Sequence, residues 1–375
     1  MKKIFSFFLA VASIFIFASC SNKKLQIKDV AIESESEFGG IYIKYTIDDF
    51  NKLGFEYGDS VDIKFSNGYE LLDQPYYNGY YVDAGKSLLV GYPGYPYIKA
   101  TLNYGDDLWQ IGKLKDDDTA TVTLKKKKKY LDIQKASDIH YYDEREKYET
   151  DEEFANFRNI KVGNIKEGIL YRSASPCDNK HKRAHYTDTL MEKANVNFIL
   201  NLADTDEKIK GYMEQDDFDS PYFKELYTKK RLFLSFAKDD KVMPLALNMN
   251  YMSDEFGQKV AMGLKTMASS NGPYLVHCLE GKDRTGFVCI VLEALMGASY
   301  KEIVDDYMLT YKNYYGIIKG DSRYDVIKKR NVDSMLEFIC NGDPNKVDIV
   351  SGTKNYLLKM GMTSSEIETL VAKLK

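Results

Sequence analysis

The chain has 375 residues, of which 44% are hydrophobic, so it is long enough for two domains with substantial cores. Its 52 basic and 56 acidic side chains give a formal net charge of −4, which argues against a nucleic-acid partner. After the N-terminal segment, no stretch approaches the roughly 18 apolar residues that a membrane span requires.

The N-terminal segment has the pattern of an export signal. Two lysines near the start precede an apolar run that ends at about Phe17, and the small residues Ala18 and Ser19 stand directly before Cys20. This pattern predicts a signal peptide over residues 1–20. Small residues before a cysteine also resemble a bacterial lipobox, which implies lipidation of Cys20 and a membrane-anchored lipoprotein on the extracytoplasmic side of a bacterial envelope. An ordinary signal peptide or an uncleaved anchor is the alternative.

Residues 25–130 have the pattern of short β-strands. Runs of alternating polarity at residues 40–45 and 61–65, and the run TATVTL that ends at Leu124, are typical of strands. Pairs such as Asn67 and Gly68 are typical of the turns between them. The pattern predicts a small β-barrel or sandwich.

A run of lysines at residues 125–129 precedes a segment rich in acidic residues. Like-charge runs of this kind are usually solvated, so we expect a domain boundary here, with a charged linker over residues 131–153 and a second domain over residues 154–375. The alternative is a polybasic patch that holds an anchored protein near anionic lipid headgroups.

The most informative segment is HCLEGKDRTG, from His277 to Gly286. A short apolar run at residues 274–276 precedes it, and an apolar helical pattern follows as far as Gly297. This order predicts a strand, a loop and a helix. Backbone N–H groups of such a loop and of the first helical turn favour an anion such as phosphate.

The side chains of this segment predict a nucleophilic site. Cys278 lies beside cations at a helix N-terminus, a setting that favours the thiolate. Arg284 offers a planar fork for two phosphoryl oxygens. We expect the Thr285 hydroxyl to hydrogen-bond the cysteine sulfur, and His277 to orient the loop through backbone contacts. Gly281 allows the backbone to turn.

The remaining loop residues are expected to surround the substrate, and they are Leu279, Glu280, Gly281, Lys282 and Asp283. Lys282 adds a positive charge at the rim. A buried structural cysteine beside an unrelated arginine is the alternative. Cys177, Cys289 and Cys340 lack a cationic glycine loop and are expected to be inert thiols.

The segment resembles the signature of protein tyrosine phosphatases, and its GKDRTG form is similar to the lipid-like bacterial subfamily. Residues 156–160 with 167–175, residues 195–207 and residues 302–310 resemble other family stretches in the same order. The resemblance implies an α/β catalytic domain over residues 154–375, with a central sheet flanked by helices. It also implies hydrolysis of phosphate monoesters through a cysteinyl-phosphate intermediate, without a metal or cofactor.

The sequence departs from the family pattern in two places. The family's DLR is Asn201, Leu202 and Ala203 here, and residues 159–161 replace the aspartate and glycines of its opening motif. No substrate role is carried over to these positions.

The implied mechanism needs an aspartate as general acid and base. The resemblance places the acid-bearing loop after the strand-like run RLFLSF, where Asp239 is the first candidate and Asp240 the second. Asp283, inside the signature, is the rival candidate.

Phosphotyrosine in protein is the first expected substrate, with dual specificity left open. An inositol-phosphate or phosphoinositide phosphatase is the alternative, favoured by Lys282 and by export to a compartment where phosphoproteins are scarce. A catalytically inactive binding lipoprotein that acts through its β-module is the second alternative.

Overall fold

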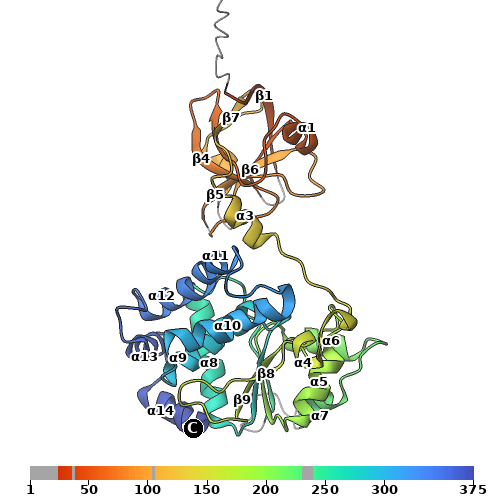
Figure 1. Ribbon diagram of the computed structural model, residues 1–375, viewed down its shortest axis with the longest axis vertical. Coiled ribbons are helices and arrows are strands. Elements are labelled where there is room, and N and C mark those ends of the chain that lie inside the picture. Colours follow the sequence, from red (N-terminus) through yellow and green to blue (C-terminus); the bar gives the residue numbers. More distant parts are fainter. Residues whose placement is uncertain (1–23, 36–38, 84, 104–105, 230–239) are drawn as a thin grey trace, which may run out of the picture. The chain divides into compact units, whose positions relative to one another are not determined.

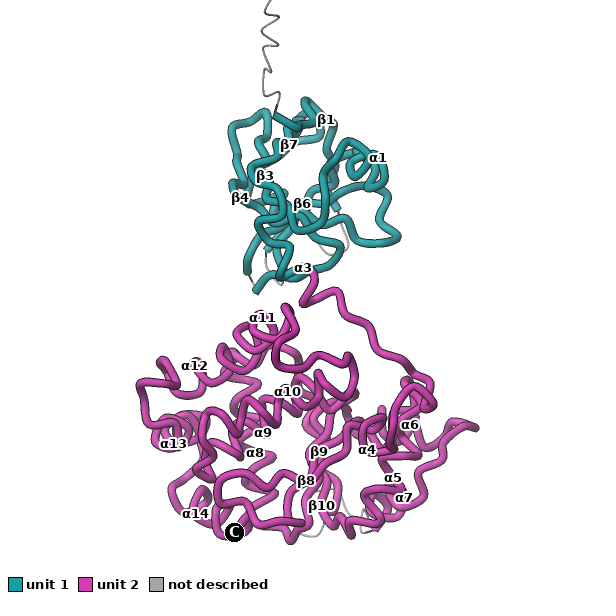
Figure 2. The backbone as a smooth tube through the Cα atoms, in the orientation of Figure 1, with its two compact units in different colours: residues 1–134 teal, residues 135–375 magenta. Residues whose placement is uncertain are grey.

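The structure is a computed structural model that describes residues 24–35, 39–83, 85–103, 106–229 and 240–375. The chain divides into two compact units, residues 1–134 and residues 135–375 (Figure 2). The predicted signal peptide, including Cys20, lies outside the described residues. Over the described ranges, no helix is both long enough and apolar enough to cross a membrane.

The first unit is a closed β-barrel whose strands follow the order β1-β2-β6-β5-β4-β3-β7. The strands are β1 (Gln26–Ser34), β2 (Ile41–Ile43), β3 (Ser60–Phe65), β4 (Glu70–Tyr77), β5 (Ser87–Val90), β6 (Ile98–Leu102) and β7 (Thr119–Lys126), and two short helices, α1 (Ile47–Lys52) and α2 (Leu108–Ile111), lie between them. Stacked Phe50 and Phe55 belong to an apolar core with side chains such as Val61 and Ile63. Closure leaves no free sheet edge, which allows a barrel this small to bury its backbone polar groups.

The lysine run belongs to the barrel unit. Lys125 and Lys126 end strand β7, and the lysines that follow form a turn. Lys127 Nζ lies 3.0 Å from a carboxylate oxygen of the fully buried Asp59, and Lys129 pairs with Asp73. The lysines are exposed, as expected of a solvated run, and the boundary between the two units follows at residues 134 and 135, so the run ends the barrel unit and also pairs with its acidic side chains.

The segment expected to be a charged linker is instead folded. It contains α3 (Leu131–Ser137), a short 3-10 helix at Arg145–Lys147 and α4 (Asp151–Phe154). Ala136, which belongs to the second unit, is only 5% exposed and joins the main core of that unit. The sequence pattern missed this because the buried residues of the segment are few and widely spaced.

The second unit is built on a five-stranded sheet of order β11-β10-β12-β9-β8. The strands are β8 (Arg158–Asn159), β9 (Leu170–Ser173), β10 (Phe198–Asn201), β11 (Val242–Pro244) and β12 (Tyr274–His277). All neighbours are parallel except β8, which runs antiparallel to β9. The carboxyl ends of β9, β10, β11 and β12 therefore share one edge of the sheet.

Helices cover both faces of this sheet (Figure 1). One layer contains α4, α5 (Ala184–Lys193), α6 (Asp206–Met213) and α7 (Pro221–Thr228). The other contains α8 (Asp254–Ser269), α9 (Asp283–Leu295), α10 (Tyr300–Tyr315), α11 (Tyr324–Lys328), the π-helix η2 (Lys329–Asp333), α12 (Ser334–Cys340), α13 (Ile349–Lys359) and α14 (Ser364–Leu374).

Alternate residues of the central strands fill two separate cores. Leu200 and Val276 pack with α8 and α9, whereas Ile199 and Leu275 pack with α5 and α7. This is the two-residue period of a strand that is buried on both faces. The predicted fold class, an α/β sheet flanked by helices and preceded by a small β-domain, is confirmed.

Candidate active site

The signature loop lies at the shared carboxyl edge of the parallel strands. β12 ends at His277, which is level with Asn201 of β10 and Ser173 of β9, and α9 begins at Asp283. Lys282 is the N-cap residue of α9 and its side chain makes no capping hydrogen bond. The first N–H groups of the helix thus have no side-chain cap, which leaves them to a bound anion.

The carbonyl oxygens of the loop are held from outside. Four donors contact three successive carbonyls. The carbonyl of Gly281 accepts from the amide of Asn156 at 3.1 Å and from the guanidinium of Arg172 at 2.9 Å. The carbonyl of Glu280 accepts from the hydroxyl of Tyr314 at 2.8 Å, and that of Leu279 from the backbone N–H of Ser175 at 3.0 Å. In a planar trans peptide the N–H points opposite to the C=O. Fixing the carbonyls outward therefore turns the following N–H groups toward the inside of the loop, where they form a cradle for an anion.

Gly281 is required by this arrangement. Its φ is +67°, and a Cβ added there would lie 2.2 Å from the backbone oxygen of Ser173. Both the left-handed backbone and the close approach to β9 exclude a side chain. The loop can pack against the end of β9 only with glycine at this position.

Arg284 keeps part of its hydrogen-bonding capacity for a ligand. Its Nη1 donates to the carbonyl of Leu247 at 3.1 Å, in the segment that follows β11. Its Nε is buried and has no partner among the described residues. This single anchor orients the guanidinium and leaves donors for phosphoryl oxygens.

Thr285 and His277 flank the site in different ways. The buried Thr285 hydroxyl has no hydrogen-bond partner in the part of the chain that is described, so the expected bond to the Cys278 sulfur is not made here. His277 Nδ1 donates to the carbonyl of Cys278 at 3.2 Å, a backbone contact of the predicted kind. Burial lowers the pKa of His277 to about 4, so the imidazole is neutral at pH 7.

The side chains of Lys282 and Glu280 form an ion pair at the rim of the signature loop. Lys282 Nζ lies 3.0 Å from Glu280 and 3.1 Å from the hydroxyl of Tyr315. Burial alone would lower the pKa of Lys282, but Asp283, Tyr311 and Glu280 raise it well above its usual value, so the ammonium stays charged. Tyr141, which precedes the family-like region, donates to Glu280 at 2.9 Å and so fixes the rim.

The three aspartates considered as general acid have different positions. Asp239 lies outside the described residues. Asp240 precedes β11, and the strand register makes Leu245, five residues later, level with Cys278. At about 3.3 Å per residue, Asp240 is roughly 16 Å away along the strand direction, at the opposite edge of the sheet. This position, near the amino ends of the parallel strands, argues against Asp240 as the acid.

Asp283 is placed at the site itself. It is the first residue of α9 and, with Arg284, lines a hollow of about 130 Å³. Burial raises the pKa of its carboxyl although 36% of the side chain is exposed. A carboxyl with a raised pKa that solvent still reaches is suited to proton transfer.

Sequence reasoning missed a buried ionic network beneath the loop. Arg172, which holds Gly281, also donates to Asp306 of α10 at 2.7 Å, and Arg158 pairs with the same carboxylate at 2.7 Å. Burial and the neighbouring Asp306 raise the pKa of Glu293 well above its usual value, so Glu293 is protonated and Asp306 carries the charge. Arg172 stands in a stretch that resembles the family, but nothing local links it to Gly281.

The other described cysteines are buried away from cationic loops. Cys177, Cys289 and Cys340 are free thiols. Burial raises the pKa of Cys289 to about 12, and it also raises the pKa of Cys177 and of Cys340. These thiols are protonated at neutral pH, as expected of inert cysteines.

A helix-flanked parallel sheet that delivers a cysteine into an anion-binding loop, closed by an arginine at a helix start, defines a cysteine-based phosphatase. The sequence model of the tyrosine phosphatase family matches residues 152–375, more than half of the chain. The chain therefore belongs to the tyrosine phosphatase family.

Other comparisons add only distant likeness. No curated protein matches the chain. Matching solved structures include the core catalytic domain of the PP-IP phosphatase SIW14 from S. cerevisiae in complex with citrate, at 17% identity and a TM-score of 0.26, covering 48% of this chain and 91% of that one. A structure of the Siw14 catalytic core is 14% identical, with a TM-score of 0.26, and covers 53% of this chain and 96% of that chain.

Proposed function

We propose that the protein hydrolyses phosphate monoesters with Cys278 as the nucleophile. The observation that carries this proposal is the loop whose three carbonyls are held outward, so that its N–H groups and Arg284 surround one anion site beside Cys278. Such preorganised donors stabilise the charge of a phosphoryl group in transfer.

The reaction has two displacements. The Cys278 thiolate attacks phosphorus, the bond from phosphorus to the ester oxygen breaks, and Asp283 gives its proton to the leaving alcohol. Water then attacks the cysteinyl-phosphate, and the carboxylate of Asp283 takes its proton. The sulfur–phosphorus bond breaks, which releases inorganic phosphate and restores the thiolate.

Two substrate classes follow from two parts of the site. The hollow beside Asp283 and Arg284 is also lined by Tyr251, Phe256 and Phe287, an apolar setting that favours the aryl group of phosphotyrosine, our first candidate. Inositol phosphates are the second candidate, favoured by Lys282, which carries a second positive charge toward a neighbouring hollow.

Turnover of p-nitrophenyl phosphate by the reduced, full-length protein tests the proposal. Cys278→Ser is expected to lose at least about a thousandfold in kcat, because an alcohol replaces the thiolate. Cys340→Ser is the matched control, since this thiol lies on α12 and not in the loop, and it should keep its activity. Absence of turnover by pure, reduced wild-type protein would support the inactive binding lipoprotein instead.

The export signal supports a location outside the cytoplasm, on a membrane, with Cys20 carrying the lipid. Cell fractionation of the wild type and of Cys20→Ala tests this. The wild type should sediment with membranes and the variant should not. Equal partition of the two would contradict the anchor.

A further inference from the structure

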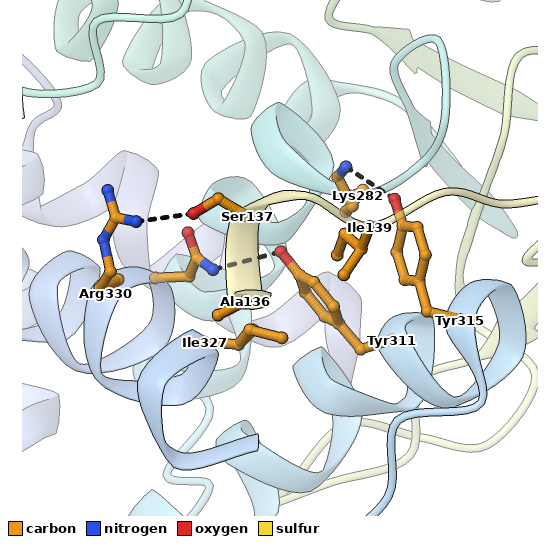
Figure 3. A pocket seen from close by; sticks show the side chains of 9 residues that line it. Ala136, Ser137, Ile139, Lys282, Tyr311, Tyr315, Ile327 and Arg330 are labelled. Carbon is orange, nitrogen blue, oxygen red and sulfur yellow. Dashed lines mark hydrogen bonds between the residues drawn. The ribbon is translucent and has the colours of Figure 1, made fainter. Parts of the chain in front are cut away.

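A second hollow adjoins the signature loop on the side of α10 and η2 (Figure 3). Its volume is about 250 Å³, and water occupies about 30 Å³ per molecule in the liquid, so a phosphate-sized anion has room there. The polar side chains that line it are Lys282, Arg330, Asn331, Tyr311, Tyr315 and Ser137, and the rest are aliphatic. The hollow lies entirely within the second unit.

The lining favours an anion. Lys282 and Arg330 bring two positive charges, and none of the lining residues, all of them in the described ranges, carries a carboxylate. Glu280 and Asp283 lie 3.0 and 3.8 Å from the Lys282 ammonium and offset part of its charge. Arg330 also has partners within the protein, and its guanidinium together with the hydroxyl and amide donors gives the lining groups that can hydrogen-bond phosphoryl oxygens.

Hydrogen bonds hold these donors in place. Arg330 Nη1 donates to the hydroxyl of Ser137 at 2.9 Å, and the amide of Asn331 donates to the hydroxyl of Tyr311 at 3.2 Å (Figure 3). Both Arg330 and Asn331 belong to the π-helix η2, a form of helix that is frequent at functional sites. Preorganised donors lose little entropy when a ligand binds.

The hollow is adjacent to the proposed reaction site. Lys282 stands two residues before Arg284, and at 3.8 Å per Cα step their backbones are at most about 8 Å apart. Asn331 lines this hollow and also the one that contains Asp283 and Arg284. We expect one small molecule to span the two hollows, because the backbones of Lys282 and Arg284 are this close. Ser137, another lining residue, precedes the residues that the family model matches.

We propose that this hollow binds a second phosphate group of the substrate whose first phosphate Cys278 attacks. The inference rests on the proposed phosphatase function and develops its second substrate candidate, a small, multiply phosphorylated polyol. A singly phosphorylated substrate leaves the hollow to water.

Two substrates that differ in charge test the subsite. Arg330→Gln should lower kcat/KM for inositol hexakisphosphate by about tenfold to a hundredfold, the usual range for loss of a charge-assisted hydrogen bond. The loss for p-nitrophenyl phosphate should be at least about tenfold smaller. Arg330→Lys should restore part of the difference, because it keeps the charge without the fork.

Lys329→Gln is the matched control. Lys329 is the exposed neighbour of Arg330 and does not line the hollow, so its loss removes the same net charge from the same helix. It should leave the ratio of the two kcat/KM values unchanged. Equal losses for both substrates in Arg330→Gln, or equal effects of Lys329→Gln and Arg330→Gln, would overturn the subsite.

A binding measurement separates failure of the subsite from failure of the phosphatase function. Titration calorimetry of Cys278→Ser with inositol hexakisphosphate should show binding that Arg330→Gln weakens about tenfold or more. If inositol hexakisphosphate binds tightly and this binding depends on Arg330, but the wild-type protein hydrolyses no phosphate ester, the proposed function is contradicted and the subsite is supported. Turnover of aryl phosphate, with binding that does not depend on Arg330, would contradict the subsite alone.

Discussion

The guanidinium of Arg172 holds the backbone of Gly281, 109 positions later in the chain, with a hydrogen bond of 2.9 Å from Nη2 to the carbonyl oxygen. Its other terminal nitrogen, Nη1, donates to Asp306 at 2.7 Å. The side chain of Arg172 is 1% exposed, so its charge is compensated inside the protein. The geometry of the signature loop thus depends on an ion pair that touches no substrate.

We predict that Asp306→Asn lowers the free energy of unfolding by about 3 kcal/mol, because it leaves two buried guanidinium groups without their carboxylate. It should also lower kcat/KM about tenfold or more through displacement of Gly281. Denaturant unfolding and p-nitrophenyl phosphate kinetics measure these effects. Asp305→Asn removes the neighbouring carboxylate, which is half exposed and pairs with Lys301, and it should change neither quantity appreciably.

Gly281→Ala should abolish most activity, about a hundredfold in kcat/KM, because the added Cβ cannot coexist with the Ser173 carbonyl and the loop must shift. Gly316→Ala is the control, since Gly316 has a similar φ of +64°, but among the described residues an added Cβ would meet no atom within 4 Å beyond its chain neighbours. The Gly316→Ala variant shows the effect of left-handed backbone strain alone, about 1–2 kcal/mol of stability, and it should leave turnover intact. If both variants retain full activity, the packing of the loop against β9 is not required.

Asp283→Asn should lower kcat about a hundredfold or more for an alkyl phosphate, whose leaving group needs a proton, and less for p-nitrophenyl phosphate. The descending limb of the kcat–pH profile, where the wild-type carboxyl loses its proton, should disappear in the variant. Asp240→Asn, at the opposite edge of the sheet, is the control. A profile that loses this limb in Asp239→Asn instead would assign the general acid to Asp239.

His277 should make the fold sensitive to acid. Its pKa is about 4 in the folded protein and about 6.5 in the unfolded chain, so the unfolded chain binds the extra proton between these values. Stability is therefore lost as the pH falls from about 6.5 toward 4. Between pH 7 and pH 5 the His277 contribution should fall by about 2 kcal/mol.

Urea unfolding of the wild type and of His277→Asn at pH 7 and pH 5 measures this effect. Asparagine keeps a donor for the Cys278 carbonyl but does not titrate. The variant should therefore lose about 2 kcal/mol less than the wild type across this interval. Parallel pH dependence in the two proteins would show that His277 does not cause the loss.

Local sequence was sufficient for the elements that carry the chemistry. The apolar run before His277, the glycine at 281 and the apolar pattern after Thr285 predicted a strand, a loop and a helix, because burial period and backbone freedom are local properties. Alternating runs likewise predicted strands β3 and β7 of the barrel. The proposed nucleophile, Cys278, and Arg284 were identifiable as a pair because they share one loop.

Contacts between distant segments were decided only by the tertiary structure. The strand register placed Asp240 toward the amino ends of the parallel strands, away from the signature loop, and this position does not depend on the residues beside Asp240. The lysine run has the composition of a solvent-exposed segment, but the folded barrel also places Asp59 beside Lys127 and Asp73 beside Lys129.

Thus the sequence by itself determined the signature loop and the α/β class, because both depend on patterns within a few residues. The tertiary structure decided what holds that loop and what surrounds it: Arg172 and Asp306 beneath Gly281, and Arg330 beside Lys282. The physical reason is that hydrogen bonds and burial act through space, and the partners of a buried polar group are set by packing.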